Sequence, residues 1–156
     1  MIKEFSSIFE QGSTEKRGKI ENIFPDFFNQ LPNQYKFLDD EQYKSVRISM
    51  GDEYLDITTK DGNSIGGVNL QKRGAMYYIK NLFIEDEFLS EGYGSLLVEL
   101  LNYFLRKQHC MGVLDDQHYF KNNKIANSGG SYDTFYEKHG WQLNSYTNLL
   151  EFNTGD

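Results

Sequence analysis

The most regular hydrophobic pattern of the chain lies between residues 76 and 107. Residues 76–84 (MYYIKNLFI) are mainly aromatic, β-branched or bulky, which predicts a buried strand. The following segment repeats apolar side chains at intervals of three and four, and these lie on one helical face: Leu96, Leu97, Leu100, Leu101, Phe104 and Leu105. Glu99, Asn102 and Arg106 fall on another face. The pattern therefore predicts a strand followed by a helix.

The turn between this strand and helix has the sequence Gly92-Tyr93-Gly94-Ser95. A glycine-containing turn that opens a helix leaves the first backbone N–H groups unpaired, at the positive end of the helix dipole. Such a turn can bind a phosphate. Glycines are also common in turns that bind no ligand, so a phosphate site and an ordinary turn are both possible interpretations of this segment.

The N-terminal third of the chain has helical periodicity. Residues 2–9 carry apolar side chains three or four positions apart and predict a short helix, and the polar residues 13–19 predict a loop. Residues 20–31 again place apolar side chains on one helical face. Pro25 lacks a backbone donor and should kink or divide this helix.

The central part of the chain alternates as strands do. Residues 43–50 and 53–59 predict two strands, and the turn Asp61-Gly62 connects the second of them to a third at 64–70. Gly66-Gly67 marks a bulge or a close approach of backbones. Three antiparallel strands thus lead into the strand–turn–helix segment.

The C-terminal third predicts one more parallel strand, a helix and a hairpin. Residues 110–114 form a short apolar strand that the helical crossover would place parallel to the strand at 76–84. Residues 115–130 predict a long polar loop. A helix would then run from an N-cap at Ser131 to a stop at Gly140, and residues 141–152 would form the hairpin.

Composition narrows the class of protein. The 156 residues fit a single domain (1–156), and 15% aromatic and 25% charged residues are typical of a globular chain. The 16 Lys and Arg stand against 23 Asp and Glu, a net charge of -7, which disfavours nucleic-acid binding and favours cationic partners. Cys110 is the single cysteine, so an internal disulfide is excluded. With neither a signal peptide nor a membrane segment in the pattern, we expect a cytoplasmic protein without a membrane partner.

Two sequence blocks resemble the motifs of a known superfamily. The first is the LFI strand end, an acidic connector and Gly92-Tyr93-Gly94-Ser95, which resembles motif A of the GNAT superfamily of N-acetyltransferases. The second, residues 135–141 (FYEKHGW), resembles that superfamily's motif B. The order and separation of the blocks also fit. The resemblance covers residues 76–152 and implies an α/β (α+β) fold with a mixed, mainly antiparallel sheet flanked by helices.

The resemblance implies an enzyme that transfers an acetyl group from acetyl-CoA to a primary amine. Tyr136 would be the general acid that protonates the departing thiolate. Backbone N–H groups near Phe83 and Ile84 would bind the acyl carbonyl, and the Gly92 turn would bind the pyrophosphate. The cofactor-binding set implied in this way is Leu82, Phe83, Ile84, Leu89, Gly92, Tyr93, Gly94 and Ser95.

Residues at the end of the next strand are candidates for the acceptor site. Asp115 and Asp116 could bind or deprotonate a cationic amine, or they could be solvated loop charges. Tyr136 likewise shares an apolar helical face with Tyr132 and Phe135, which is the pattern of a core residue. The histidines and Cys110 have no metal-ligand spacing, so we predict no metal.

Two departures from motif A open an alternative function. Leu89 stands where the superfamily has Arg or Gln, and Glu91 places a carboxylate immediately before Gly92. A catalytically inactive GNAT-fold binding or regulatory protein is therefore the alternative. A third interpretation, an unrelated α/β fold that binds another phosphate ligand, leaves the second block unexplained.

Overall fold

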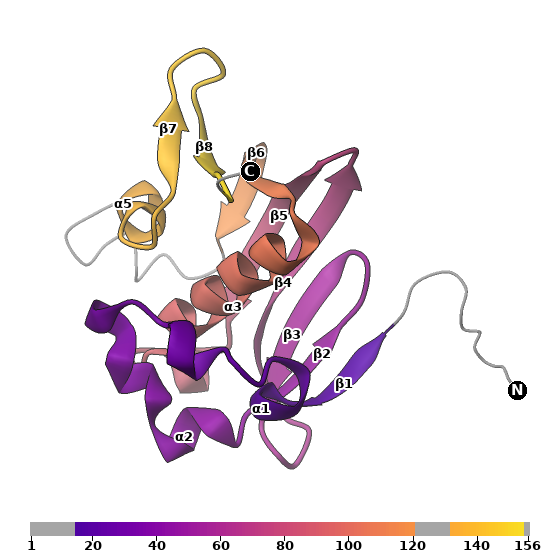
Figure 1. Ribbon diagram of the computed structural model, residues 1–156, viewed down its shortest axis with the longest axis vertical. Helices are drawn as coiled ribbons and strands as arrows, with labels where there is room; N and C mark the ends of the chain where they lie inside the picture. Colours follow the sequence, from indigo (N-terminus) through magenta and orange to yellow (C-terminus); the bar gives the residue numbers. More distant parts are fainter. Residues whose placement is uncertain (1–14, 121–131, 155–156) are drawn as a thin grey trace, which may run out of the picture.

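A computed structural model describes residues 15–120 and 132–154, which form one mixed sheet with helices (Figure 1). The sheet has eight strands in the order β1-β2-β3-β4-β5-β6-β8-β7. All neighbours are antiparallel except β5 and β6, which are parallel. This mixed, mainly antiparallel sheet confirms the predicted fold class.

The strands have the following bounds: β1 Lys16–Lys19, β2 Arg47–Met50, β3 Tyr54–Thr58, β4 Ser64–Arg73, β5 Met76–Ile84, β6 Met111–Phe120, β7 Gln142–Asn144 and β8 Leu149–Phe152. The α-helices are α1 Ile20–Ile23, α2 Glu41–Lys44, α3 Tyr93–Gln108 and α5 Tyr132–Glu137. Short 3-10 helices are η1 Phe28–Gln30, η2 Asn33–Asp39 and η3 Asp86–Phe88. Within the described ranges, no helix has the length and apolar character needed to cross a membrane.

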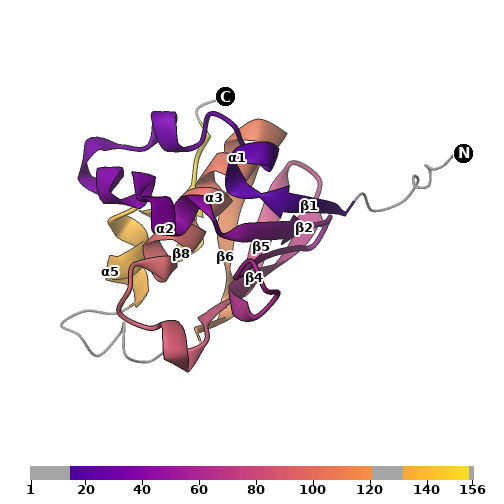
Figure 2. The same ribbon diagram turned by 90° about the horizontal axis from the view of Figure 1, so that it is seen from below.

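The helices pack on one face of the sheet, as the view from below shows (Figure 2). Buried side chains alternate along β3 and β5, because successive strand residues point to opposite faces. The helix α3 packs against β4, β5 and β6. The rings of Phe24 and Phe27 pack edge-on against that of Tyr103 in α3, with centroid distances of 4.9 and 5.6 Å. The core therefore lies between the sheet and α3, with the N-terminal helices closing it.

Several predicted elements are confirmed, with shifts at their ends. The helix predicted at 20–31 is divided at Pro25, into α1 and η1. The Asp61-Gly62 turn joins β3 to β4, with Gly62 at φ +91°. Gly66 does lie at a close approach, because a Cβ there would sit 2.3 Å from the carbonyl oxygen of Phe83. The helix predicted at 2–9 and the N-cap at Ser131 lie outside the described residues.

Three expectations about element boundaries were wrong. Residues 16–19 form β1 rather than a loop, because they pair with β2. The polar sequence of this segment has no pattern that predicts the pairing. Residues 43 and 44 belong to α2 rather than to a strand, since Asp40 caps that helix through Gln42 N–H at 2.9 Å. Residues 115–120 continue β6 rather than begin the long loop. The N-terminal helices consequently lie between the first and second strands.

Candidate active site

The parallel strands β5 and β6 lose their register near the middle of their contact. Ile79 pairs with Leu114, and the next pair is Asn81 with Tyr119. Lys80 alone on β5 therefore spans four residues of β6, 115–118, which we call the β6 bulge. Lys80 is also the extra residue of a bulge against β4. Bulges interrupt a ladder and re-aim side chains, and they are frequent beside active sites.

Asp115, at the start of the β6 bulge, is paired with a lysine of the same chain. Lys80 Nζ lies 2.8 Å from Asp115 Oδ2, and the Asp115 side chain is only 10% exposed. Asp116 is exposed. Of the two carboxylates predicted to meet a cationic amine, Asp115 is thus already neutralised by Lys80, and Asp116 faces solvent.

His118, at the end of the β6 bulge, connects β5 to Tyr136. Its Nδ1 lies 3.0 Å from the carbonyl oxygen of Ile79, and its Nε2 lies 3.1 Å from Tyr136 Oη. A carbonyl oxygen can only accept, so Nδ1 must carry a proton. In the neutral imidazole Nε2 is then an acceptor for the Tyr136 hydroxyl. We call these two residues the His118–Tyr136 dyad.

Tyr136 is fully buried, and the chain fixes its ring from several sides. After α5 ends at Glu137, the amides of His139 and Trp141 donate to the Tyr136 carbonyl at 2.9 and 3.3 Å. This reversal needs Gly140, whose φ is +92°. Trp141 then packs against Tyr136 with ring centroids 5.3 Å apart. The glycine and the aromatic residue of the second motif therefore have a structural purpose, which is to hold Tyr136 in place.

A buried polar network supports this turn from α3. His139 Nδ1 lies 2.6 Å from Glu99 Oε2, and both side chains are at most 3% exposed. Asn102 donates from Nδ2 to the His139 carbonyl and accepts from Trp141 Nε1, each at 2.9 Å. The sequence pattern places Glu99 and Asn102 on a separate helical face but does not reveal these partners. The sequence feature that could have indicated a buried network is the pair Glu99 and Asn102, two polar residues one turn apart among the apolar residues of 96–105.

The N-terminal segment also reaches the same turn. The Tyr35 ring of η2 stacks on His139 with centroids 4.5 Å apart, and its hydroxyl donates to the Lys138 carbonyl at 2.6 Å. Burial raises the pKa of Tyr35, so the hydroxyl remains a donor near neutral pH. The 3-10 helix η2 and the helix α3 thus both hold the turn that follows α5.

The turn before α3 presents backbone donors, as its sequence predicts. Gly92 is the N-cap with φ +87°, and in the described structure no side chain caps the helix there. Leu96 N–H donates to the Gly92 carbonyl at 3.0 Å. The N–H groups of Tyr93, Gly94 and Ser95 precede this first helical bond, so they lie at the positive end of a 16-residue helix.

Tyr43 of α2 holds the chain just before this turn. Its hydroxyl donates to the Glu91 carbonyl, and its ring meets that of Tyr93 with centroids 5.2 Å apart. Burial raises the pKa of Tyr43, which keeps the hydroxyl protonated. The Glu91 side chain is exposed and can point to solvent, whereas Leu89 packs against the core and offers a phosphate no polar contact.

The end of β5 directs its amides alternately to β4 and β6. Glu85 N–H donates to the Ile65 carbonyl of β4 at 2.8 Å. Since amides alternate along a strand, Phe83 also faces β4, while Leu82 and Ile84 face β6. Leu82 already pairs with Phe120. Of the amides predicted to bind an acyl carbonyl, that of Ile84 therefore points toward β6, the strand that carries His118.

A buried acceptor beside the β6 bulge fits an acyl-CoA or amine ligand. The side-chain oxygen of Asn81 is buried and, among the described residues, has no hydrogen-bond partner. Buried polar atoms without a partner are rare in folded proteins. Both the amide groups of acetyl-CoA and an amine acceptor carry N–H donors. The buried acceptor on Asn81 and the backbone donors before α3 therefore both fit acetyl-CoA, the cofactor that the motifs imply.

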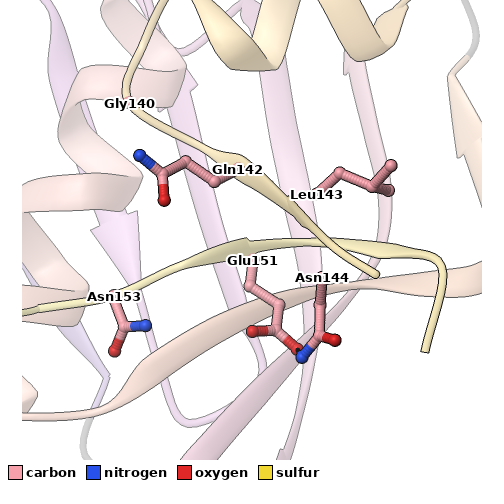
Figure 3. Close-up of a pocket in the computed structure, with 6 residues that line it drawn as sticks. All are labelled: Gly140, Gln142, Leu143, Asn144, Glu151 and Asn153. Atoms are coloured by element: carbon pink, nitrogen blue, oxygen red, sulfur yellow. Dashed lines mark hydrogen bonds between the residues drawn. The ribbon is translucent and has the colours of Figure 1, made fainter. Parts of the chain in front are cut away.

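A separate hollow lies on the C-terminal hairpin and contains none of the predicted site residues (Figure 3). It measures about 220 Å³ and is lined by Gly140, Gln142, Leu143, Asn144, Glu151 and Asn153. Asn144 Nδ2 donates to Glu151 Oε2 at 2.8 Å. Two of the polar groups that line the hollow, those of Asn144 and Glu151, are therefore directed at each other.

We predict that Gly92→Ala destabilises the fold by about 1–3 kcal/mol, because a left-handed φ strains any side chain. The new Cβ would also lie 2.7 Å from Tyr43 Oη. Gly62→Ala is the matched control, since Gly62 has φ +91° but a Cβ added there would meet no atom within 4 Å. Urea unfolding of both variants should show a larger loss for Gly92→Ala. Equal losses would mean that the Tyr43 contact contributes nothing.

Comparisons with known proteins identify the fold. The structure superimposes on the ribosomal-protein-S18-alanine N-acetyltransferase from Escherichia coli with a TM-score of 0.50, at 13% identity over 89% of this chain and 93% of that chain. No protein-family model and no curated protein matches the sequence. The chain therefore has the fold of the GNAT N-acetyltransferases.

Two further solved structures, both in complex with CoA, are similar at a TM-score of 0.49 and 13% identity. The PaiA N-acetyltransferase from Thermoplasma acidophilum aligns over 92% of this chain and 99% of that chain. For the GNAT family N-acetyltransferase YhbS from Escherichia coli, the alignment covers 66% of this chain and 59% of that one.

Proposed function

We propose that this protein is an N-acyltransferase that transfers an acetyl group from acetyl-CoA to a primary amine. The observation that carries the proposal is the position of the Tyr136 hydroxyl, which contacts His118 of the β6 bulge. This hydroxyl lies beside the β6 bulge, next to the strand that leads into the uncapped turn of α3. The GNAT fold supports the same activity by analogy alone.

Each part of the site has a task in this reaction. Acetyl-CoA supplies an activated thioester. The N–H groups of Tyr93, Gly94 and Ser95 would bind its pyrophosphate, as helix N-termini bind anions. The Ile84 amide would bind the acyl carbonyl and stabilise the oxyanion. Tyr136 would donate a proton to the departing sulfur.

We propose a cationic amine as the acceptor, such as a polyamine, an aminoglycoside or a protein lysine. The net charge of -7 attracts cations, and the exposed Asp116 lies within the β6 bulge. Asp115 would attract the amine less strongly than Asp116, because the charge of Asp115 is already paired with Lys80.

A GNAT-fold protein without catalytic activity is the second candidate, and it is favoured by Leu89 and Glu91. The apolar Leu89 cannot contact a phosphate, and Glu91 brings a negative charge close to the pyrophosphate site. In this case the protein would stay folded without binding CoA.

Calorimetry with acetyl-CoA and CoA distinguishes the two candidates. A ligand at 100 times its dissociation constant stabilises a fold by about 2.7 kcal/mol, which raises the melting temperature clearly. We expect Gly94→Val to weaken binding, because a side chain would stand among the donors. We expect Glu91→Gln to strengthen it about fivefold, since removing a like charge at short range is worth ~1 kcal/mol. An unchanged melting temperature at millimolar CoA would exclude the enzyme and support the binding protein.

A further inference from the structure

The His118–Tyr136 dyad is arranged to accept a proton as well as to donate one. Ile79 fixes the proton of His118 on Nδ1, which leaves Nε2 as a base when the imidazole is neutral. The hydroxyl of Tyr136 then donates to Nε2. In this state the hydroxyl proton is not available to a leaving group, so Tyr136 can serve as an acid only after His118 has gained a proton.

We propose that His118 is the proton acceptor of the reaction and acts through Tyr136. This inference rests on the proposed acetyl transfer. As the neutral amine attacks the thioester carbonyl and the C–N bond forms, the Tyr136 oxygen takes the amine proton while the Tyr136 proton moves to His118 Nε2. As the C–S bond breaks, Nε2 returns its proton to the Tyr136 oxygen and Tyr136 protonates the thiolate sulfur. One proton enters and one leaves, so the dyad is restored after each turnover.

The other charged groups near the β6 bulge are less suited to this task. Lys80 and Asp115 are paired with each other, and the Asp116 side chain is exposed to solvent. His139 of the neighbouring turn is buried against Glu99. His118 is the described imidazole that bonds directly to the Tyr136 hydroxyl.

The tautomer of His118 provides a test that does not depend on activity. In nitrogen-15 NMR spectra of the whole protein labelled at histidine, with the His118 signals assigned from a His118→Asn variant, we expect Nδ1 to be protonated and Nε2 to be unprotonated above neutral pH. Tyr136→Phe should shift the Nε2 signal. A proton on Nε2 in the neutral imidazole would overturn the proposal, because Nε2 would then have no capacity to accept.

Kinetics test the role of His118 in the reaction. We expect His118→Asn to lower kcat by about 10²–10⁴-fold, the usual range for general acid–base catalysis, with little change in KM for acetyl-CoA. Because the two residues act as one unit, the variant with both His118→Asn and Tyr136→Phe should be no slower than about the worse single variant. The matched control is His109→Asn, at the end of α3 with φ +54°, which Asn tolerates.

The pH profile separates a proton-transfer role from a structural one. With a hydrazide acceptor, which stays unprotonated across the range, the rate of the wild-type protein should fall at low pH, because a protonated His118 cannot accept the proton of Tyr136. His118→Asn should abolish this dependence. An active wild-type protein whose rate is unchanged by His118→Asn would overturn the inference and leave the proposed function standing. Absence of transfer by the wild-type protein to any of the amine acceptors would instead refute the proposed function.

Discussion

Replacing Tyr136 by Phe is expected to lower kcat for acetyl transfer by about 10²–10⁴-fold, which is the usual contribution of a general acid. The departing thiolate loses its proton donor, and His118 loses its hydrogen-bond partner. Binding of acetyl-CoA should remain, because the backbone donors before α3 do not involve Tyr136. Steady-state kinetics with thiol detection would measure kcat and KM separately.

Tyr35→Phe is the matched control for this prediction. It also removes a tyrosine hydroxyl at the turn after α5, since Tyr35 donates to the Lys138 carbonyl, but this hydroxyl lies outside the dyad. We expect a loss of about 0.5–1.5 kcal/mol in the free energy of unfolding, the usual net contribution of one hydrogen bond, because Gln34 Nε2 still donates to the same carbonyl. Activity should remain nearly full. Equal activity in both variants would remove Tyr136 as the acid.

Replacing Glu99 by Ala is expected to destabilise the fold by about 3 kcal/mol, which is the upper end of the usual cost of leaving a buried polar group without its hydrogen-bond partner. Glu99 and His139 are almost completely buried, so water cannot replace the lost partner. The turn that holds Tyr136 should loosen at the same time. Urea unfolding measures the free energy of unfolding, and a cost below ~1 kcal/mol would contradict the importance of this hydrogen bond.

Removing both partners tests whether the cost comes from the unpaired group. In the variant with both Glu99→Leu and His139→Phe, the Phe ring can still stack on Tyr35, and an apolar pair replaces the hydrogen-bonded one. We expect this double variant to lose less stability than Glu99→Ala alone, since replacing both partners of a buried hydrogen bond by apolar groups of similar shape can be nearly neutral.

The sequence predicted the elements whose pattern is local. The strand at 76–84, the long helix after Gly92 and the C-terminal hairpin all follow from periodicity and turn residues. The parallel pairing of β5 with β6 followed from the handedness of a helical crossover. Gly92 and Gly140 have the positive φ values that their places in the two motifs require.

What the sequence missed depends on tertiary contacts. A polar segment such as residues 16–19 becomes a strand only because β2 lies beside it. The extension of β6 past Leu114 follows a bulge that has no hydrophobic signature. In the sequence His118 has no signal beyond a spacing unsuited to metal binding, and its contact with Tyr136 depends on how that bulge places it against α5. Pairings between residues distant in sequence require the fold before they can be seen.

The most direct test is to incubate the protein with acetyl-CoA and each acceptor class, namely a polyamine, an aminoglycoside and a lysine-containing peptide, and to detect acetylated amine by mass spectrometry. We predict that one of these acceptors gains an acetyl group, that free CoA appears in equal amount, and that Tyr136→Phe abolishes most of this product. If no acceptor gains an acetyl group at concentrations of acetyl-CoA that saturate the protein, the chain is not the N-acyltransferase proposed.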